Sequence, residues 1–274
     1  MPFARAQAIL KRILPEPVFE TIYAKTCIGY VKYRKIADTV YYLTPRLDID
    51  DARRAMMIRT IRPYTMVGRD GLLATYDCMQ KAEQAKLSGC LVECGVARGG
   101  CSALMALVSR DCGSNRVSWL FDSFEGLPAK TIEDGNPRIS NGTDRHTDRL
   151  SEGYCLGTLD EVEELFYRTL MFQKDNVRMV KGWFQDTLPQ YREKVGDIAV
   201  LRIDGDWFES TKCCLENLYD NVVDDGYVIL DDYALVGCRK AVDEFLASRG
   251  VSPEMTLDGR GGAWFKKESA EKII

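Results

Sequence analysis

From about residue 70 onward, short apolar runs alternate with longer segments whose apolar residues recur at helical spacing. A strand that is buried on both faces is continuously hydrophobic, so the short runs predict strands. The predicted strands are 90–94, 117–121, 177–181, 198–203 and 227–230. The predicted helices are about 70–86, 99–109, 158–173, 209–222 and 237–249. This alternation is typical of a doubly wound, mostly parallel sheet that is covered by helices on both faces.

The chain after the last predicted helix has a different pattern. Two short apolar segments, 254–257 and 263–267, flank the turn sequence D-G-R-G-G at 258–262. Such a turn between two strands predicts an antiparallel hairpin. The predicted fold class is therefore α/β, with a doubly wound, seven-stranded, mostly parallel sheet that ends in an antiparallel C-terminal hairpin.

Residues 1–60 form a separate predicted segment. Residues 1–46 contain eight lysines and arginines against three acidic residues, and apolar residues at helical spacing predict short amphipathic helices there. We interpret this N-terminal helical appendage as a cap or an oligomerisation contact, with docking on a membrane surface as the weaker alternative. The main domain is then 61–274. Within it, residues 129–157 are rich in Gly, Asn, Asp and Ser, and this length predicts a lid or substrate loop.

The composition narrows the classes of function. The 274 residues are 46% hydrophobic and 28% charged, as in globular proteins. With 37 basic and 41 acidic residues the formal net charge is -4, which argues against a nucleic-acid-binding protein. No uncharged run approaches the roughly 18 residues of a membrane span, and the first residues lack the apolar centre of a signal peptide. We therefore expect a cytoplasmic protein with a small-molecule substrate.

The ten cysteines and the single histidine do not form a zinc pattern. No two cysteines have the C-x-x-C spacing, and His146 is the only imidazole in the chain. We therefore expect reduced thiols, most of them in the core. His146 falls in the predicted lid. It is either a surface residue or a residue that contacts the substrate or acts as its base.

Two predicted strands end in carboxylates. Asp204 and Asp206 follow the fourth strand, and Asp231 and Asp232 follow the fifth. In a doubly wound sheet these strands are neighbours, so their ends lie roughly 5 Å apart. Carboxylates that close repel each other unless a cation or shared protons intervene. Oxygen ligands of this kind favour Mg2+ or Mn2+ over Zn2+, and the predicted metal ligands are Asp204, Asp231 and Asp232.

A metal at this edge of the sheet would have a chemical purpose. A bound dication lowers the pKa of a coordinated hydroxyl and orients its oxygen toward a donor. We predict Asp204 as a metal ligand and as the catalytic residue that accepts the proton, with Asp206 as the reserve candidate. The alternative is that these acids cap helices or pair with Arg202 and Arg239.

A glycine-bearing turn follows the first predicted strand. The sequence E-C-G-V-A-R-G-G at 93–100 joins that strand to a helix, and such a turn directs backbone N–H groups at a ligand. A dinucleotide fingerprint would have glycine where this chain has Ala97. The spacing instead suits S-adenosylmethionine, and Asp122, at the end of the next strand, is placed to accept its ribose hydroxyls. The alternative is that the glycines only allow tight packing of the helix on the strand.

Trp183 and Phe184 follow the third predicted strand. Their rings are suited to lie against an adenine ring, and equally to fill the core.

Together these motifs resemble the macrocin O-methyltransferase family of bacterial sugar methyltransferases. The matching segments span about residues 60–245. They are R-P-Y-T-M at 62–66, E-C-G-V-A-R-G-G at 93–100, F-D-S-F-E-G-L-P at 121–128, Gly182 with D-T-L-P at 186–189, D-G-D at 204–206 with E-S-T at 209–211, and D-D-Y at 231–233. The resemblance implies a class I methyltransferase fold, the donor S-adenosyl-L-methionine, Mg2+ held by Asp204, Asp231 and Asp232, and methylation of a sugar hydroxyl.

The resemblance also implies a set of donor-binding residues, in which residues 64–66 close over the donor. The full predicted set is Tyr64, Thr65, Met66, Glu93, Gly95, Val96, Ala97, Ser102, Asp122, Ser123, Gly182, Trp183, Phe184 and Asp204. Ala97 and the pair Trp207-Phe208 depart from the family pattern, which indicates a reshaped pocket. The predicted partners are a small glycoside or glycan substrate and further copies of the chain in a homo-oligomer.

Three other functions stay open on the sequence alone. The vicinal hydroxyls of a catechol-type phenol would chelate Mg2+ as well as those of a sugar. A non-catalytic binding protein with a methyltransferase fold is the second alternative, although the acids are intact. A nicotinamide-dependent dehydrogenase fits least, because its glycine spacing differs.

Overall fold

The structure is a computed structural model that describes residues 38, 40, 41, 44, 48–135 and 152–268. By its internal contacts the chain divides into two units, which are residues 1–56 with 141–143, and residues 57–140 with 144–274. The predicted N-terminal appendage lies almost entirely outside the described residues. In the first unit the structure describes the start of the helix α3 (Ile49–Ile61), which carries the ion pairs Arg53–Asp50 and Arg54–Asp51.

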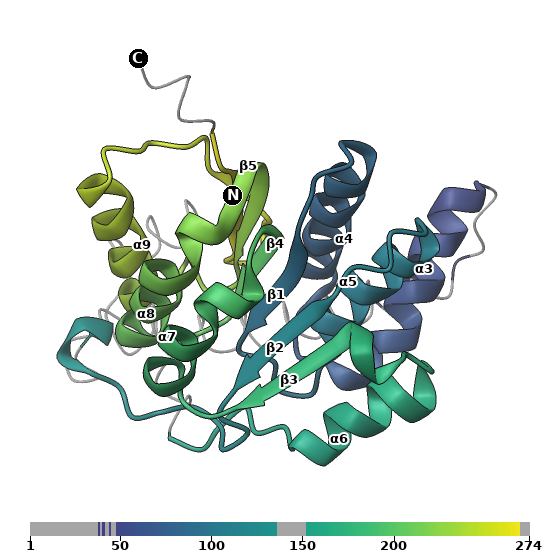
Figure 1. Ribbon diagram of the computed structural model, residues 1–274, viewed down its shortest axis with the longest axis horizontal. Coiled ribbons are helices and arrows are strands. Elements are labelled where there is room, and N and C mark those ends of the chain that lie inside the picture. The colour runs from purple at the N-terminus through teal and green to yellow at the C-terminus, as the bar shows by residue number, and fades with distance from the viewer. Residues whose placement is uncertain (1–37, 39, 42–43, 45–47, 136–151, 269–274) are drawn as a thin grey trace, which may run out of the picture. The chain divides into compact units, whose positions relative to one another are not determined.

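The second unit is built on a seven-stranded sheet with the strand order β3-β2-β1-β4-β5-β7-β6 (Figure 1). Strands β1 to β5 run parallel to one another, and β7 is antiparallel to both β5 and β6. The strands are β1 (Cys90–Cys94), β2 (Ser118–Asp122), β3 (Val177–Lys181), β4 (Ile198–Ile203), β5 (Val222–Leu230), β6 (Thr256–Leu257) and β7 (Ala263–Lys266). The predicted fold class, a mostly parallel sheet with an antiparallel C-terminal hairpin, is confirmed.

Helices cover both faces of this sheet. α4 and α5 pack together on one face, and α7, α8 and α9 form a row on the other (Figure 1). The helices are α4 (Arg69–Gln84), α5 (Gly100–Asp111), α6 (Leu159–Glu163), α7 (Phe184–Val195), α8 (Phe208–Leu218) and α9 (Val236–Ser248). Short 3-10 turns lie at Arg62–Tyr64, Ile132–Asp134, Lys174–Asn176 and Tyr219–Asn221.

Three elements differ from the sequence prediction. The helix α7, which contains Pro189, is absent from the prediction, but the parallel crossover from β3 to β4 requires an element that packs back on the sheet. α6 continues as a π-helix, Glu164–Thr169, instead of one long α-helix. β5 begins at Val222 rather than at residue 227, because Val222 pairs with Ile198 before a register shift.

The register of the parallel strands brings four strand ends to one edge of the sheet. Cys94 pairs with Phe121 on one side and with Ile203 on the other, and Ile203 pairs with Leu230. The residues that follow these four positions are Gly95, Asp122, Asp204 and Asp231. The sheet therefore places the glycine turn between the acidic ends of β2 and β4.

The central strands form the core of the second unit. β1 and β4 are buried at every position. Arg202, in β4, is 0% exposed although it is charged. An isolated ion at this depth would cost several kcal/mol, so this side chain requires acidic partners.

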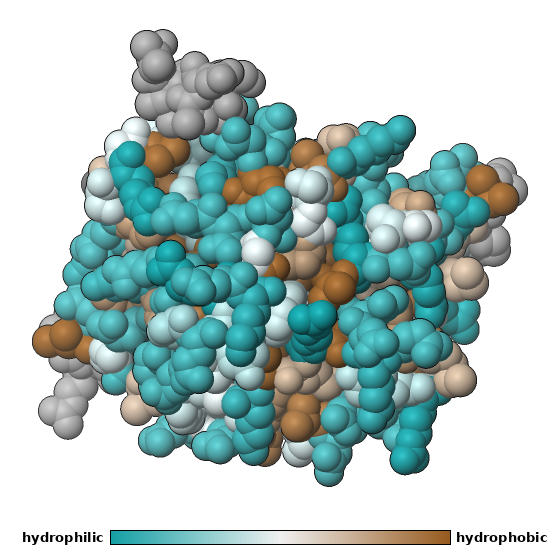
Figure 2. Space-filling model, viewed as in Figure 1, coloured by the Kyte–Doolittle hydropathy of each residue, from teal (hydrophilic) through white to brown (hydrophobic). Residues whose placement is uncertain are grey.

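The face of the molecule drawn in Figure 2 is mainly hydrophilic, and its apolar patches are small and separate. Among the residues that the structure describes, no helix is long and apolar enough to cross a membrane.

Gly95 is required where the end of β1 approaches β4. Its φ is +89°, and a Cβ atom at this position would lie 1.8 Å from the backbone oxygen of Asp204. The Gly95 N–H donates to the carbonyl of Phe121 at 2.9 Å, and the Asp204 N–H donates to the carbonyl of Cys94 at 2.8 Å. A side chain on Gly95 would therefore push the glycine turn away from the acidic strand end.

We predict that Gly95→Ala lowers the free energy of unfolding by more than about 3 kcal/mol, because it adds a backbone overlap to the strain of a positive φ. Gly113→Ala is the matched control. Gly113 has a φ of +79°, and no atom lies within 4 Å of its added Cβ, so the substitution should cost only about 1 kcal/mol. Urea unfolding of both variants measures the difference, and equal costs would contradict the steric argument.

Candidate active site

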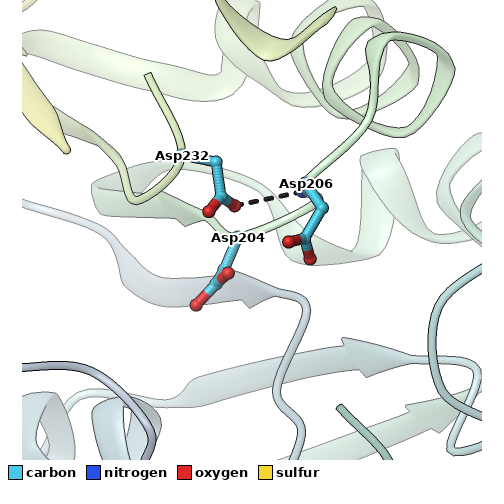
Figure 3. Close-up of side chains that lie close together, drawn as sticks. All are labelled: Asp204, Asp206 and Asp232. Atoms are coloured by element: carbon cyan, nitrogen blue, oxygen red, sulfur yellow. Dashed lines mark hydrogen bonds between the residues drawn. The ribbon is translucent and has the colours of Figure 1, made fainter. Parts of the chain in front are cut away.

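Three aspartates meet at the carboxyl edge of the sheet (Figure 3). Asp204 and Asp206 belong to the loop after β4, and Asp232 belongs to the loop after β5. One carboxylate oxygen of each residue lies within 4.8 Å of those of the other two. The N–H of Asp206 donates to Asp232 Oδ2 at 3.1 Å, which ties the two loops together. We call Asp204, Asp206 and Asp232 the acidic cluster.

Asp206 is held in an unusual backbone conformation. Its φ is +55°, a region that residues other than glycine rarely adopt. The hydrogen bond to Asp232 and the start of α8 at Phe208 hold it there. This turn brings a second carboxylate beside Asp204, and strained positions of this kind gather at functional sites.

The acidic cluster holds more negative charge than its neighbours neutralise. Burial raises the pKa of Asp204, and the charge of Asp231 raises it further. Burial and then the charge of Asp204 raise the pKa of Asp206 well above its ordinary value, and burial and then the charge of Asp206 do the same for Asp232. Within the described part of the chain, neither Asp206 nor Asp232 forms an ion pair.

Asp231 is engaged by two arginines. Arg202 Nη2 donates to Asp231 Oδ1 at 2.5 Å, and Arg260 Nη1 donates to Asp231 Oδ2 at 2.7 Å. Burial by itself would raise the pKa of Asp231, but the two guanidinium groups outweigh burial and lower the pKa. This carboxylate is therefore ionised and paired with two cations, whereas Asp204 has one arginine partner and Asp206 and Asp232 have none among the described residues.

The cluster thus differs in one member from the ligand set predicted from the sequence. The structure brings Asp204 and Asp232 together and adds Asp206, which the sequence analysis kept only as a reserve base. A pair with Arg202, the alternative expected for these acids, is present for both Asp204 and Asp231. Arg239 takes no part, because its Nε donates to the carbonyl of Tyr233 at 3.1 Å.

Arg202 joins the acidic edge to the glycine turn. Its buried side chain contacts Glu93 at 3.3 Å and Asp204 at 2.9 Å, in addition to Asp231. Glu93 also accepts a hydrogen bond from the Ser102 hydroxyl. Burial raises the pKa of Glu93 to about 8, against the charge of Arg202, so this carboxyl retains a proton near neutral pH. Glu93 and Ser102, both predicted to bind the donor, lie in this buried network.

Asp122 organises the glycine turn. Its Oδ2 accepts the N–H groups of Val96 at 2.6 Å and Ala97 at 2.9 Å, and its Oδ1 accepts that of Phe124 at 2.6 Å. These bonds hold Ala97 at a φ of +45°. The structure therefore unites the turn and the acid that the sequence analysis assigned to one donor site.

Residues 64–66 lie at the start of α5. A Cβ atom on Gly100 would lie 2.6 Å from Thr65 Cβ and 2.7 Å from the carbonyl oxygen of Tyr64. Thr65 Oγ1 lies 3.7 Å from Cys101 Sγ, and Met66 is 54% exposed. The segment predicted to close over the donor is therefore packed against the helix that follows the glycine turn.

The end of β3 supplies two aromatic residues in different environments. The N–H of Gly182 donates to the carbonyl of Asp122 at 2.9 Å, which fixes this end beside the glycine turn. Trp183 is the N-cap of α7 and is partly exposed, whereas Phe184 packs against the main core. Ser123 lies in the turn after β2, where its hydroxyl bonds the backbone. Both rings are half-buried, and Trp183 is the one that does not belong to the main core.

The outgoing arm of the predicted lid is anchored to the start of α8. Trp207 Nε1 donates to the carbonyl of Pro128 at 3.1 Å, and the N–H of Phe208 donates to Asp134 Oδ1 at 2.6 Å. Trp207 and Phe208, which differ from the family pattern, therefore hold the lid arm in place. The sequence analysis missed Asp134, although T-I-E-D at 131–134 has the spacing of the capping box that Thr131 and Asp134 form.

The returning arm of the lid is anchored to the glycine turn. Tyr154 O accepts the N–H of Leu127 at 2.8 Å, and a Cβ atom on Gly157 would lie 2.1 Å from the carbonyl oxygen of Ala97. Cys155 lies in this arm, next to Tyr154. Burial, together with the negative charges of the acidic cluster, raises the pKa of its thiol to about 12, so the thiol is near the cluster. No sequence pattern pointed to it. His146 lies outside the described residues.

The donor atoms of the acidic cluster suit a hard divalent cation. Mg2+ and Mn2+ prefer carboxylate oxygens, and the cluster offers three carboxylates that repel one another in the absence of a cation. The site thus combines three carboxylates that suit a cation with a glycine turn on the neighbouring strand end.

Residues 8–267 match the family described as Macrocin-O-methyltransferase (TylF). This match extends on both sides of residues 60–245, the part of the chain that carries the motifs found in the sequence.

Individual relatives share most of their length with this chain. Over 205 residues it is 40% identical to the 8-demethyl-8-(2,3-dimethoxy-alpha-L-rhamnosyl)-tetracenomycin-C 4'-O-methyltransferase of Streptomyces olivaceus, which covers 73% of this chain and 75% of that protein. Over 247 residues it is 29% identical to the mycinamicin III 3''-O-methyltransferase of Micromonospora griseorubida, which covers 89% and 94%. The solved structure of the O-methyltransferase NovP matches with a TM-score of 0.63 at 33% identity, over 75% of this chain and 83% of that one.

We predict that Asp206→Asn stabilises the protein in the presence of a chelator. The raised pKa of Asp206 means that the folded chain retains a proton that the unfolded chain releases, so stability falls as the pH rises above the ordinary aspartate pKa of about 4. A neutral amide removes this loss, and the Tm near neutral pH should rise by about 2–4 °C. In the control Asp220→Asn, the Tm should fall slightly, because the hydrogen bonds of Arg249 lower the pKa of Asp220. A lower Tm for Asp206→Asn would contradict the expectation.

Proposed function

The chain belongs to the macrocin-O-methyltransferase family, and we propose that it transfers the methyl group of S-adenosylmethionine to a sugar hydroxyl of a natural product or glycan with the help of a divalent cation. Family membership makes the chain an O-methyltransferase. The observation that carries the proposal is the acidic cluster at the end of β4, directly beside the glycine turn at the end of β1. This arrangement would bring a methyl donor and an activated hydroxyl to neighbouring strand ends.

The proposed donor site lies over the ends of β1, β2 and β3. Asp122 would accept a ribose hydroxyl, and the half-buried ring of Trp183 would lie against the adenine. Residues 64–66, which pack on α5, would cover the donor. Glu93 and Ser102 would support the glycine turn and would not contact the donor directly, since both are buried.

The proposed cation site consists of Asp204, Asp206 and Asp232. A bound dication lowers the pKa of a hydroxyl that it coordinates and orients the oxygen. Asp204 would accept the proton of the acceptor hydroxyl as the acceptor oxygen bonds to the methyl carbon and the bond from that carbon to sulfur breaks. Asp206 is the second candidate for this base, because its carboxylate forms no ion pair within the described residues.

Charge balance supports a dication at this site. The aspartates that follow β4 and β5 are near two arginines, Arg202 and Arg260. Glu93, with its pKa of about 8, adds little negative charge near neutral pH. With Asp204, Asp206, Asp231 and Asp232 ionised, two negative charges are uncompensated, which is the charge that one Mg2+ or Mn2+ neutralises.

The relatives guide the choice of acceptor. Two of them are named for the 4'-O-methylation of a rhamnosyl tetracenomycin and the 3''-O-methylation of mycinamicin III. We therefore propose a glycoside acceptor, which the two anchored arms of the lid would border. A catechol-type phenol is the alternative that the acceptor assay below tests. A cap or oligomerisation role for residues 1–60 and a cytoplasmic location stay predictions.

We predict that Trp183→Ala weakens the binding of S-adenosylhomocysteine about tenfold, because stacking of a base on an aromatic ring contributes about 1–3 kcal/mol. Its unfolding free energy should fall less than that of the matched control Phe184→Ala, because both side chains are half-buried but only Phe184 packs against the main core. Phe184→Ala should lower the unfolding free energy by about 2 kcal/mol without changing the affinity of the folded protein. Titration calorimetry and urea unfolding separate the two effects, and the reverse pattern would assign the adenine contact to Phe184.

We predict that Asp204→Asn lowers the rate of methyl transfer at least about a hundredfold, the contribution of a general base, while the fold and the binding of S-adenosylhomocysteine persist. Asp197→Asn, at an exposed aspartate just before β4, is the control and should retain full activity. The assay follows labelled methyl transfer to deoxysugar glycosides and to catechols, with Mg2+ or with excess chelator. Full activity in chelator would exclude the cation, and activity on catechols alone would exclude the sugar acceptor.

A further inference from the structure

Arg260 reaches the active site from a rigid turn. It stands in the connection between β6 and β7, where Asp258 Oδ1 accepts the N–H groups of Arg260 at 2.7 Å, Gly261 at 3.0 Å and Gly262 at 3.0 Å. The carbonyl of Gly261 also accepts the N–H of Ala234, in the loop that begins with Asp231 and Asp232. The turn is therefore fixed to the same loop that supplies part of the acidic cluster.

The two arginines that hold Asp231 differ in their freedom. Arg202 has no exposed surface and extends from the centre of β4, whereas the side chain of Arg260 is 28% exposed and extends from a turn. Arg202 also pairs with Glu93 and Asp204. Within the described residues, Arg260 pairs with Asp231 alone. Of the two contacts to Asp231, the contact of Arg260 is the one that can break without disturbing the core.

The oxygen that Arg260 holds is on the residue next to a proposed cation ligand. Asp231 Oδ2, which Arg260 holds at 2.7 Å, belongs to the residue directly before Asp232. If Arg260 withdraws, this carboxylate oxygen becomes free to bind a cation. The positive charge of Arg260 further opposes a cation at the cluster, because like charges at this range repel each other even through a partly solvated medium.

We propose that Arg260 competes with the divalent cation for the carboxylate of Asp231, and that the β6–β7 turn thereby sets the cation affinity of the active site. The proposal rests on the cation site proposed above. It makes Arg260 a positioning residue, since it acts through Asp231 and has no contact with the reacting atoms. A merely structural Arg260 would influence stability alone.

The test is a titration of the full-length protein with Mn2+, in which the free ion is followed by electron paramagnetic resonance. Arg260→Met keeps the aliphatic part of the side chain, which lies along Gly68 and Gly71, and removes the guanidinium group. We expect Arg260→Met to bind Mn2+ about tenfold more tightly than the wild type, because Asp231 Oδ2 becomes free to bind the ion and the weaker repulsion of one unit charge is also removed. Arg260→Lys retains the charge and should stay within about threefold of the wild type. An unchanged or weaker affinity in Arg260→Met would overturn the proposal.

A double-mutant cycle with Asp231→Asn shows whether the effect passes through Asp231. In the Asp231→Asn background, Arg260→Met should change the Mn2+ affinity by less than about threefold, because the amide leaves no charged oxygen to release. A tenfold gain that persists in this background would assign the effect to charge alone and would overturn the competition.

Two controls keep this test separate from that of the proposed function. A wild-type protein that binds no Mn2+ would overturn the cation site itself, whereas a wild type that binds Mn2+ with no change in Arg260→Met would overturn only the role of Arg260. Circular dichroism and thermal unfolding in chelator establish that each variant is folded. Arg260→Gln provides the same loss of charge if Arg260→Met is unstable, and the same increase in affinity is expected.

Discussion

The buried guanidinium group of Arg202 is the interaction on which the carboxyl edge of the sheet depends. It stands on the central strand β4 with no exposed surface, and it contacts Glu93 on β1, Asp204 at the end of its own strand and Asp231 at the end of β5. A charge at this depth is tolerated only when acidic partners surround it. The register that joins β1, β4 and β5 therefore also fixes the carboxylates from which the site is built.

The acids of the edge fall into two groups with different electrostatics, because Arg260 joins Arg202 at Asp231 only. Asp231, held by two arginines, has a lowered pKa, while the pKa values of Asp204, Asp206 and Asp232 are raised by burial and mutual repulsion. The second group costs the protein stability when no cation is present, and sites of function commonly carry such a cost. The same repulsion would favour the binding of a divalent cation. Repulsion among these carboxylates therefore affects both the stability of the chain and its affinity for a cation.

Much of this arrangement was predictable from the hydrophobic pattern. Every strand that the pattern predicts is present, as are the hairpin, the glycine turn and the acid at the end of β2. The helix α7 was not predicted, although Phe184, Leu188 and Val195 recur at helical spacing and a crossover between β3 and β4 requires an element there. The local capping box at 131–134 indicates Asp134, but the bond of Asp134 to Phe208 and the position of Cys155 near the acidic cluster join segments that lie far apart in the sequence.

The sequence by itself determined that four aspartates follow two neighbouring strands and that a glycine turn stands beside them, because such features depend on short apolar runs and on the residues next to them. Only the tertiary structure decided which aspartates share a cluster. Chain neighbours such as Asp231 and Asp232 differ in direction at a strand end, and the two arginines that claim Asp231 each lie 29 residues away along the chain, one before it and one after it. Competition between these distant charges, rather than any local pattern, assigns the carboxylates to their roles.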